Sequence, residues 1–185
     1  AVGTRNVASG QAVSAVGYSN VASGAFSNAF GTATIANKQG AIAVGGWYDK
    51  DHDNSFMHGG SETAAATGVS SVAMGAGVTA TADYSSVFGV GSQATAQNAT
   101  AIGFNSLANE ANTVSVGRSG AEKRITNVAD AVNAKDAANK GYVDTALSNF
   151  TGNADAVLYD TGTNKATLIL AGKKKKKITN LQDAT

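Results

Sequence analysis

The chain has 185 residues, of which 43% are hydrophobic, 15% charged and only 6% aromatic, with 22 glycines and no proline or cysteine. This composition excludes the wide core of an ordinary globular enzyme and favours a repeat protein with a narrow core of small side chains. The formal net charge is +1, but Lys173 to Lys177 supply five of the 14 basic residues, so the rest of the chain is mildly acidic and lacks the distributed basic surface that binds nucleic acid.

Glycines recur at a fixed period through the first two thirds of the chain. They are fourteen residues apart, with one interval of sixteen: Gly3, Gly17, Gly31, Gly45, Gly59, Gly75, Gly89, Gly103 and Gly117. An alanine follows most of them five residues later: Ala8, Ala22, Ala36, Ala64, Ala80, Ala94 and Ala108, whereas Lys50 and Glu122 break the rule. This period predicts a repeat architecture of nine turns.

Each repeat predicts two short strands. Segments such as 71–75 and 113–117 alternate apolar with small or polar residues, as a strand with one buried face does. Glycine permits the bend after the first strand, and alanine suits a position where the opposite wall is close. Because one coil of this length buries too little surface alone, the coils must stack, and residues 1–120 predict a mainly β, single-stranded parallel solenoid. Its apolar flanks and open ends favour association with further copies.

One repeat is interrupted by an aromatic and acidic segment, residues 47–58. We expect this segment to leave the solenoid. Trp47 and Tyr48 are candidate ligand contacts, because exposed aromatic side chains contribute much of the binding energy of interfaces. The alternative is that they cap the solenoid where one turn is irregular.

The same segment resembles the start of a calcium loop. Asp49, Asp51 and Asp53 alternate as calcium ligands do, but the twelfth position is Gly60 instead of glutamate, so a solvated loop is favoured and no metal site is assigned. His58 stands where other repeats have an apolar residue, and we expect it to have a structural role.

A helix and a hairpin are predicted downstream. Val143, Leu147 and Phe150 lie at helical spacing and predict one apolar stripe, in a short coiled coil or linker over 144–152. That stripe packs either against other copies or on the solenoid of its own chain. Two β-rich runs, AVLYD and ATLIL, predict a hairpin module over 153–177 that pairs within an assembly.

The lysine run from Lys173 to Lys177 has two interpretations. Five consecutive like charges repel one another and favour a solvated loop. In an oligomer the same residues would form a cationic ring that attracts sulfated glycans or anionic host surfaces.

The strands SVAMG, SVFG and TAIG, with their fourteen-residue spacing and following alanines, resemble the head repeats of YadA-type trimeric autotransporter adhesins. The resemblance implies a left-handed parallel β-roll, three copies of which pack around a threefold axis. Residues 121–143 are similar to the family's neck, on these positions: Ile125, Asn127, Val128, Asp136, Asn139 and Val143. Residues 178–185 repeat its beginning and resemble the start of a second neck.

This resemblance implies a non-enzymatic adhesin that attaches bacteria to host cells or extracellular matrix proteins. It implies a homotrimer without a cofactor, on the bacterial cell surface, anchored in the outer membrane through a C-terminal region outside this sequence. No residue is assigned to catalysis, because no Ser/His/Asp arrangement and no cysteine is present. Two alternatives stay open: a spacer solenoid within a fibre, and a hexapeptide-type acyltransferase, although the coils of such enzymes run in multiples of six residues.

Overall fold

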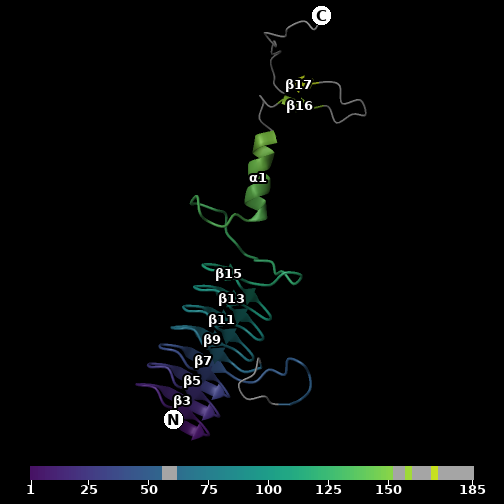
Figure 1. Ribbon diagram of the computed structural model, residues 1–185. Coiled ribbons are helices and arrows are strands. Elements are labelled where there is room, and N and C mark those ends of the chain that lie inside the picture. The colour runs from purple at the N-terminus through teal and green to yellow at the C-terminus, as the bar shows by residue number, and fades with distance from the viewer. Residues whose placement is uncertain (56–61, 152–156, 160–167, 171–185) are drawn as a thin grey trace, which may run out of the picture. The chain divides into compact units, whose positions relative to one another are not determined.

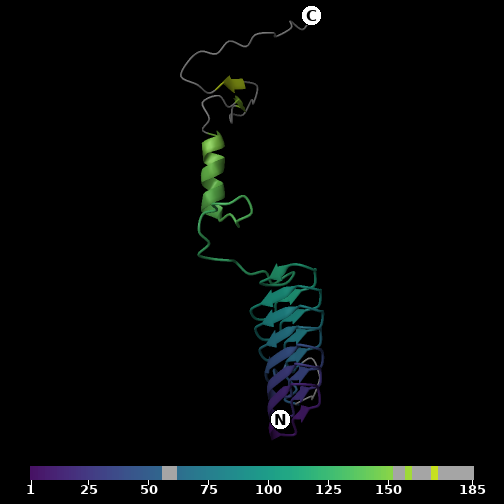
Figure 2. The same cartoon turned by 90° about the vertical axis from the view of Figure 1, so that its left-hand side faces the viewer.

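The computed structural model describes residues 1–55, 62–151, 157–159 and 168–170, which belong to two compact units, Ala1–Arg124 and Ile125–Thr185. The first unit is a parallel β-solenoid, whose turns stack one on the next (Figure 1). Each complete turn contributes one strand to each of two sheets, and Figure 2 shows the same stack turned by 90°.

Two parallel sheets form the walls of the solenoid. One contains β1 (Val2–Thr4), β3 (Ser14–Tyr18), β5 (Asn28–Thr32), β7 (Ile42–Gly45), β9 (Val72–Met74), β11 (Ser86–Phe88), β13 (Thr100–Ile102) and β15 (Val114–Ser115), in that order. The other contains β2 (Val7–Ala8), β4 (Val21–Ala22), β6 (Ile35–Ala36), β8 (Ala65–Ala66), β10 (Thr79–Ala80), β12 (Gln93–Ala94) and β14 (Leu107–Ala108). Paired residues are fourteen positions apart in every regular step, as Ser86 and Thr100 are.

Small side chains fill the space between the two sheets. Ala29 and Ala43 on one wall, and Ala36 and Ala80 on the other, are fully buried members of one core cluster. The expectation of a narrow core is thereby confirmed. The sheets are close enough that the larger side chains on neighbouring positions point outward, as the alternation of burial along the strands shows.

The prediction of nine turns is wrong. Val44 of β7 pairs directly with Met74 of β9, thirty positions later, so β7 and β9 are adjacent in the sheet. The inserted segment is sixteen residues long, thirty minus fourteen, and it enters between the two strands of a single turn. Because sixteen is close to one turn of fourteen, the insertion preserves the apparent glycine period without adding a turn.

The same insertion corrects the alanine assignment. Ala66, rather than Ala64, pairs with Ala36 and Ala80 in the alanine column. Ala64 instead occupies the position of Thr34 one turn earlier, since its carbonyl oxygen accepts the amide of Ile35 as that of Thr34 accepts the amide of Val21.

Gly117 also departs from the predicted column. Strand β15 ends at Ser115, and the carbonyl oxygen of Gly117 accepts the amide of Leu107 at 2.8 Å. In the preceding turn Ser106 accepts the equivalent bond from Gln93, so the last turn is three residues shorter than the period requires, 117 minus 106 being eleven. The chain then leaves the stack.

The second unit contains one helix and one hairpin. Helix α1 (Lys140–Thr151) begins inside the stretch assigned to the neck, and the Asn139 side-chain oxygen caps it by accepting the Tyr142 amide at 2.8 Å. The two predicted β-rich runs pair antiparallel as β16 (Val157–Tyr159) and β17 (Leu168–Leu170). The described helices include none with the length and hydropathy of a transmembrane segment.

Hydrogen bonds organise the neck-like stretch before the helix. Asp136 accepts the amides of Val132 and Asn133, and these bonds hold the pKa of its carboxyl below the usual value, with that from Asn133 the stronger cause. The Asn139 amide donates to the carbonyl oxygen of Val128 at 2.9 Å. Ile125 is 70% exposed.

Several predictions concern residues outside the described part of the chain. They are the role of His58, the glycines at positions 59 and 60, the lysine run 173–177 and the second neck over 178–185.

Candidate functional site

The segment inserted between β7 and β8, which we call the excursion, is anchored to the solenoid by one carboxylate. Glu62 accepts the indole N–H of Trp47 at 2.9 Å through one oxygen and the amide of Lys50 at 2.9 Å through the other. Its carbonyl oxygen accepts the amide of Tyr48 at 2.8 Å. The bonds from the indole and then from the Lys50 amide lower the pKa of the Glu62 carboxyl. The two ends of the excursion are therefore joined where they leave the solenoid.

Tyr48 lies against the turns that follow the excursion. A Cβ added to Gly77 would be 2.9 Å from the Cβ of Tyr48, and one added to Gly91 would be 3.3 Å from its ring. The rings of Tyr48 and Phe104 meet edge to face, with centroids 6.3 Å apart. Tyr48 thus packs across successive turns, while Trp47 beside it is 36% exposed.

Three carboxylates gather in the excursion. Oxygens of Asp49, Asp51 and Glu62 lie within 4.8 Å of one another. Asp49 also accepts the amides of Asp53 and Asn54, both at 3.2 Å, so the alternating aspartates stabilise a turn of the loop. Desolvation is the main cause that raises the pKa of Asp51. These internal bonds account for the acidic pattern, and the group by itself assigns no cation.

Apolar side chains form a continuous stripe on the outer face of the eight-stranded sheet. We define the apolar stripe as the seven residues that precede the column glycines, together with Val116, which follows β15 in the last turn: Val2, Val16, Phe30, Val44, Met74, Phe88, Ile102 and Val116. Register places the first seven on successive strands. The exposed fraction is 37% at Phe30 and 44% at Ile102, so the stripe is open to solvent in a single chain.

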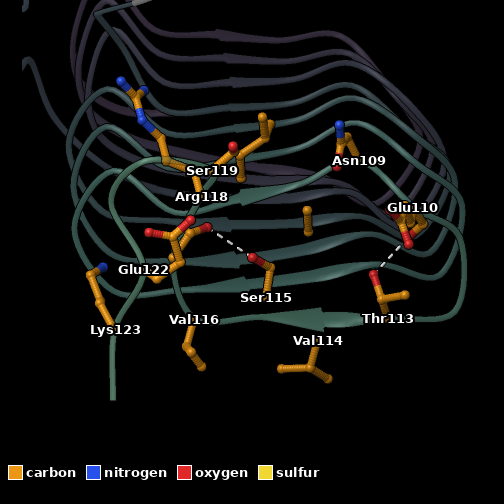
Figure 3. A pocket seen from close by; sticks show the side chains of 13 residues that line it. Asn109, Glu110, Thr113, Val114, Ser115, Val116, Arg118, Ser119, Glu122 and Lys123 are labelled. Carbon is orange, nitrogen blue, oxygen red and sulfur yellow. Dashed lines mark hydrogen bonds between the residues drawn. The ribbon is translucent and has the colours of Figure 1, made fainter. Parts of the chain in front are cut away.

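A hollow of about 640 Å³ lies at the last turn, where β14 and β15 have no further described strand to pair with (Figure 3). Arg118, Glu122 and Lys123 lie on one side of it and Glu110 on the opposite side (Figure 3). The ammonium of Lys123 donates to the carbonyl oxygen of Phe104 at 2.5 Å and to the Ser106 hydroxyl at 3.1 Å. Lys123 therefore caps polar groups that a further turn would otherwise satisfy.

Strand pairing places most predicted repeat residues in two columns. Gly3, Gly17, Gly31 and Gly45 are in register, and the chain continues through Gly75, Gly89 and Gly103, each of whose amides bonds to the preceding strand. The alanine column contains Ala8, Ala22, Ala36, Ala66, Ala80, Ala94 and Ala108. Sequence reasoning missed Glu62 and Lys123, because their partners lie twelve or more positions away.

The model of the YadA head domain repeat, in its two-copy form, matches three overlapping segments of the chain, residues 66–92, 80–106 and 94–119. No curated protein sequence matches the chain. Each matched segment spans about two turns of the solenoid, and the unmatched turns before residue 66 continue the same strand register. The chain therefore carries YadA head domain repeats, which are typical of trimeric autotransporter adhesins, built as a parallel β-solenoid.

Proposed function

We propose that this chain is the adhesive head of a trimeric autotransporter, which attaches bacteria to host cells or to extracellular matrix proteins. The observation that carries the proposal is the match of residues 66–119 to YadA head repeats. Proteins with these repeats form a non-enzymatic adhesin family exposed at the bacterial surface. The fourteen-residue step between paired strands also distinguishes the solenoid from acyltransferases whose coils run in multiples of six residues.

The apolar stripe supports assembly into a homotrimer. A row of half-exposed apolar side chains along the length of a thin solenoid is an unusual feature for a monomer, and burial against other copies would remove it from water. Three identical chains can bury the same stripe around one axis, since a cyclic assembly uses the same surfaces on every subunit. We propose that the roll is left-handed, as the family resemblance implies.

The second unit supports the same arrangement. Val143 and Leu147 of α1 are four residues apart on one helix face, and they are 51% and 60% exposed. Helices with such a stripe are stabilised by pairing along it. We propose that residues 121–143 act as the neck and 144–152 as the first part of a helical stalk, with the hairpin of β16 and β17 as a stalk module.

A trimer would present each surface feature three times. Contacts that are weak singly then add through multivalency when the target also repeats, as fibrous matrix proteins do. We propose Trp47, at the exposed side of the excursion, as a contact for such a target.

The test combines mass with attachment. The full chain, measured by light scattering, should have a mass three times 18.4 kDa, and beads coated with it should attach to host cells or to immobilised matrix proteins. Beads coated with an unrelated solenoid serve as control. A folded monomer would contradict the assembly, and a trimer that attaches to neither cells nor matrix would leave a spacer solenoid as the function.

A further inference from the structure

A small polar pocket lies on the flank of the solenoid beside the excursion. Its volume is about 160 Å³. Lys50 reaches it from the excursion, Gln93 and Asn105 from two successive turns, and Arg118 from the last turn. Ordinary small-molecule sites measure about 300–1,000 Å³, so this pocket suits one charged group and the sugar unit that carries it.

Two cations line the pocket, and a third is bonded to one of its lining residues. Lys50 and Arg118 line it and are exposed to solvent, and Lys123 donates a hydrogen bond of 3.1 Å to the hydroxyl of the lining residue Ser106. Within the described part of the chain, the sole ion pair joins Lys140 and Asp144 in the second unit. None of the three cations is therefore neutralised by a carboxylate among the described residues.

The neighbouring carboxylates accept hydrogen bonds from other groups, those of Asp49 and Asp51 from backbone amides within the excursion. Both oxygens of Glu62 accept N–H groups, from Trp47 and from the backbone of Lys50. Glu122 accepts the amide of Gly120 at 2.9 Å. The side-chain amides of Gln93 and Asn105 form no hydrogen bond with another described residue, so they too are available to a ligand.

We propose that this pocket binds an anionic group of an acidic polysaccharide, a sulfate or a carboxylate. Guanidinium and ammonium groups form short, charge-assisted hydrogen bonds with such oxyanions, and the two amides match the hydroxyls of the attached sugar. The pocket is too small to seat an extended acidic peptide, which would need a groove. The proposal deepens the adhesin function by naming a ligand class, but each chain contains a whole pocket, so binding does not require the trimer.

The experiment is a calorimetric titration of the full chain with a sulfated disaccharide and, separately, with an unsulfated uronate disaccharide. The double variant Lys50→Gln/Arg118→Gln should bind about tenfold more weakly or worse, because two charge-assisted hydrogen bonds are lost. The sugar that the wild type binds more tightly identifies whether sulfate or carboxylate is recognised.

Two controls separate this pocket from other cations. Lys38→Gln removes an exposed lysine of the solenoid that is not in the pocket, and it should leave the affinity unchanged. Replacement of Lys173 to Lys177 with glutamine should also leave it unchanged. Trp47 fluorescence, from the single tryptophan, verifies that each variant keeps the folded excursion.

Three results would overturn the proposal: undiminished affinity in the double variant, loss of affinity on replacing the lysine run, or equally tight binding of a hexaglutamate peptide. Light-scattering mass and attachment to matrix proteins are recorded on the same variants. A double variant that loses the sugar but keeps its mass and attachment supports the pocket and leaves the adhesin proposal intact. A wild-type chain that binds the sugar but is monomeric and attaches to neither cells nor matrix would contradict only the adhesin proposal.

Discussion

Backbone conformation at single residues determines the shape of each turn. Every regular turn has three positions with positive φ, such as Gly17 at 121°, Ser19 at 56° and Phe26 at 61°. Only the first is glycine in every turn. At that position the carbonyl oxygen of the next turn leaves no room for a side chain. A Cβ added to Gly17, for example, would lie 2.0 Å from the carbonyl oxygen of Gly31. At the other two positions the strain of a left-handed side chain is tolerated.

Gly75→Ala should destabilise the solenoid strongly. A Cβ there would lie 1.6 Å from the carbonyl oxygen of Gly89, in a backbone with φ of +141°. We expect the free energy of unfolding to fall by at least about 2 kcal/mol. Thermal unfolding followed by circular dichroism measures the change. Gly46→Ala is the matched control, because a Cβ at Gly46 meets no atom within 4 Å; similar losses in both variants would refute the argument from close approach.

Tyr84→Asn should stabilise the chain. Tyr84 has φ of +60° and is 56% exposed, and the same position in the next two turns is Asn98 and Asn112, whose side chains share a hydrogen bond of 3.0 Å. Asparagine adopts left-handed backbone more readily than tyrosine and would extend this ladder, so we expect a gain of about 0.5–1 kcal/mol in the free energy of unfolding. Urea unfolding measures this gain. Tyr84→Ala is the control, because alanine also removes the ring but has neither the backbone preference nor the hydrogen bond of asparagine. Equal stability of the two variants would count against the prediction.

At the scale of elements, the excursion is the irregular part of the solenoid. It is held at its base by Glu62 and at its side by Tyr48, whose ring needs glycine beneath it at Gly77. The equivalent position in earlier turns is Arg5, Ser19 or Ala33, each also at positive φ. Positions 77 and 91 are therefore occupied by glycine because Tyr48 lies close to them, and not only because their φ is positive.

The base of the excursion should respond to acid. The Glu62 pKa is lowered below 4.5 in the folded chain by the Trp47 and Lys50 donors, so its bonds are stabilising above the unfolded pKa and are lost as the pH falls through the folded value. Because Trp47 is the single tryptophan, its fluorescence should change with a midpoint below pH 4.5. Glu62→Gln should remove this transition and Glu122→Gln should keep it. A midpoint at or above 4.5 would contradict the assignment.

At the scale of the whole molecule, the apolar stripe is an exposed apolar surface that runs along the described turns of the solenoid. A thin solenoid with a core of small side chains has no interior space for Phe30 or Phe88, so these side chains lie outside, where the proposed trimer would cover them. The same geometry that makes the core narrow thus favours oligomerisation.

The double variant Met74→Ser/Phe88→Ser should weaken the proposed trimer. These side chains are 41% and 42% exposed in one chain, and losing their burial should cost about 1 kcal/mol per side chain in each of three subunits. Light scattering over a dilution series should show dissociation at higher concentration than for the wild type. Tyr84→Ser/Phe26→Ser is the control, since both rings are exposed but lie off the stripe; a trimer that tolerates the first variant as well as the second would exclude this seam.

Sequence period determined the parallel solenoid, the narrow core and the position of the excursion. Glycine and alanine recur because each column has the same backbone geometry and the same close neighbours in every turn. The same residue type is therefore needed every fourteen positions, and this spacing can be seen in the sequence. The two antiparallel strands near the end of the chain were predictable for a similar reason, since their β-rich runs are separated by a short turn sequence.

Tertiary structure alone decided the number of turns and the composition of the surface sites. An insertion of sixteen residues looks like one more turn of fourteen until strand pairing shows Val44 next to Met74. Likewise Lys50 and Arg118 are 68 positions apart, 118 minus 50, and line one pocket only because the excursion folds back over later turns. Stacking makes residues fourteen apart neighbours by rule, whereas contacts made by an insertion follow no period, so no spacing in the sequence predicts them.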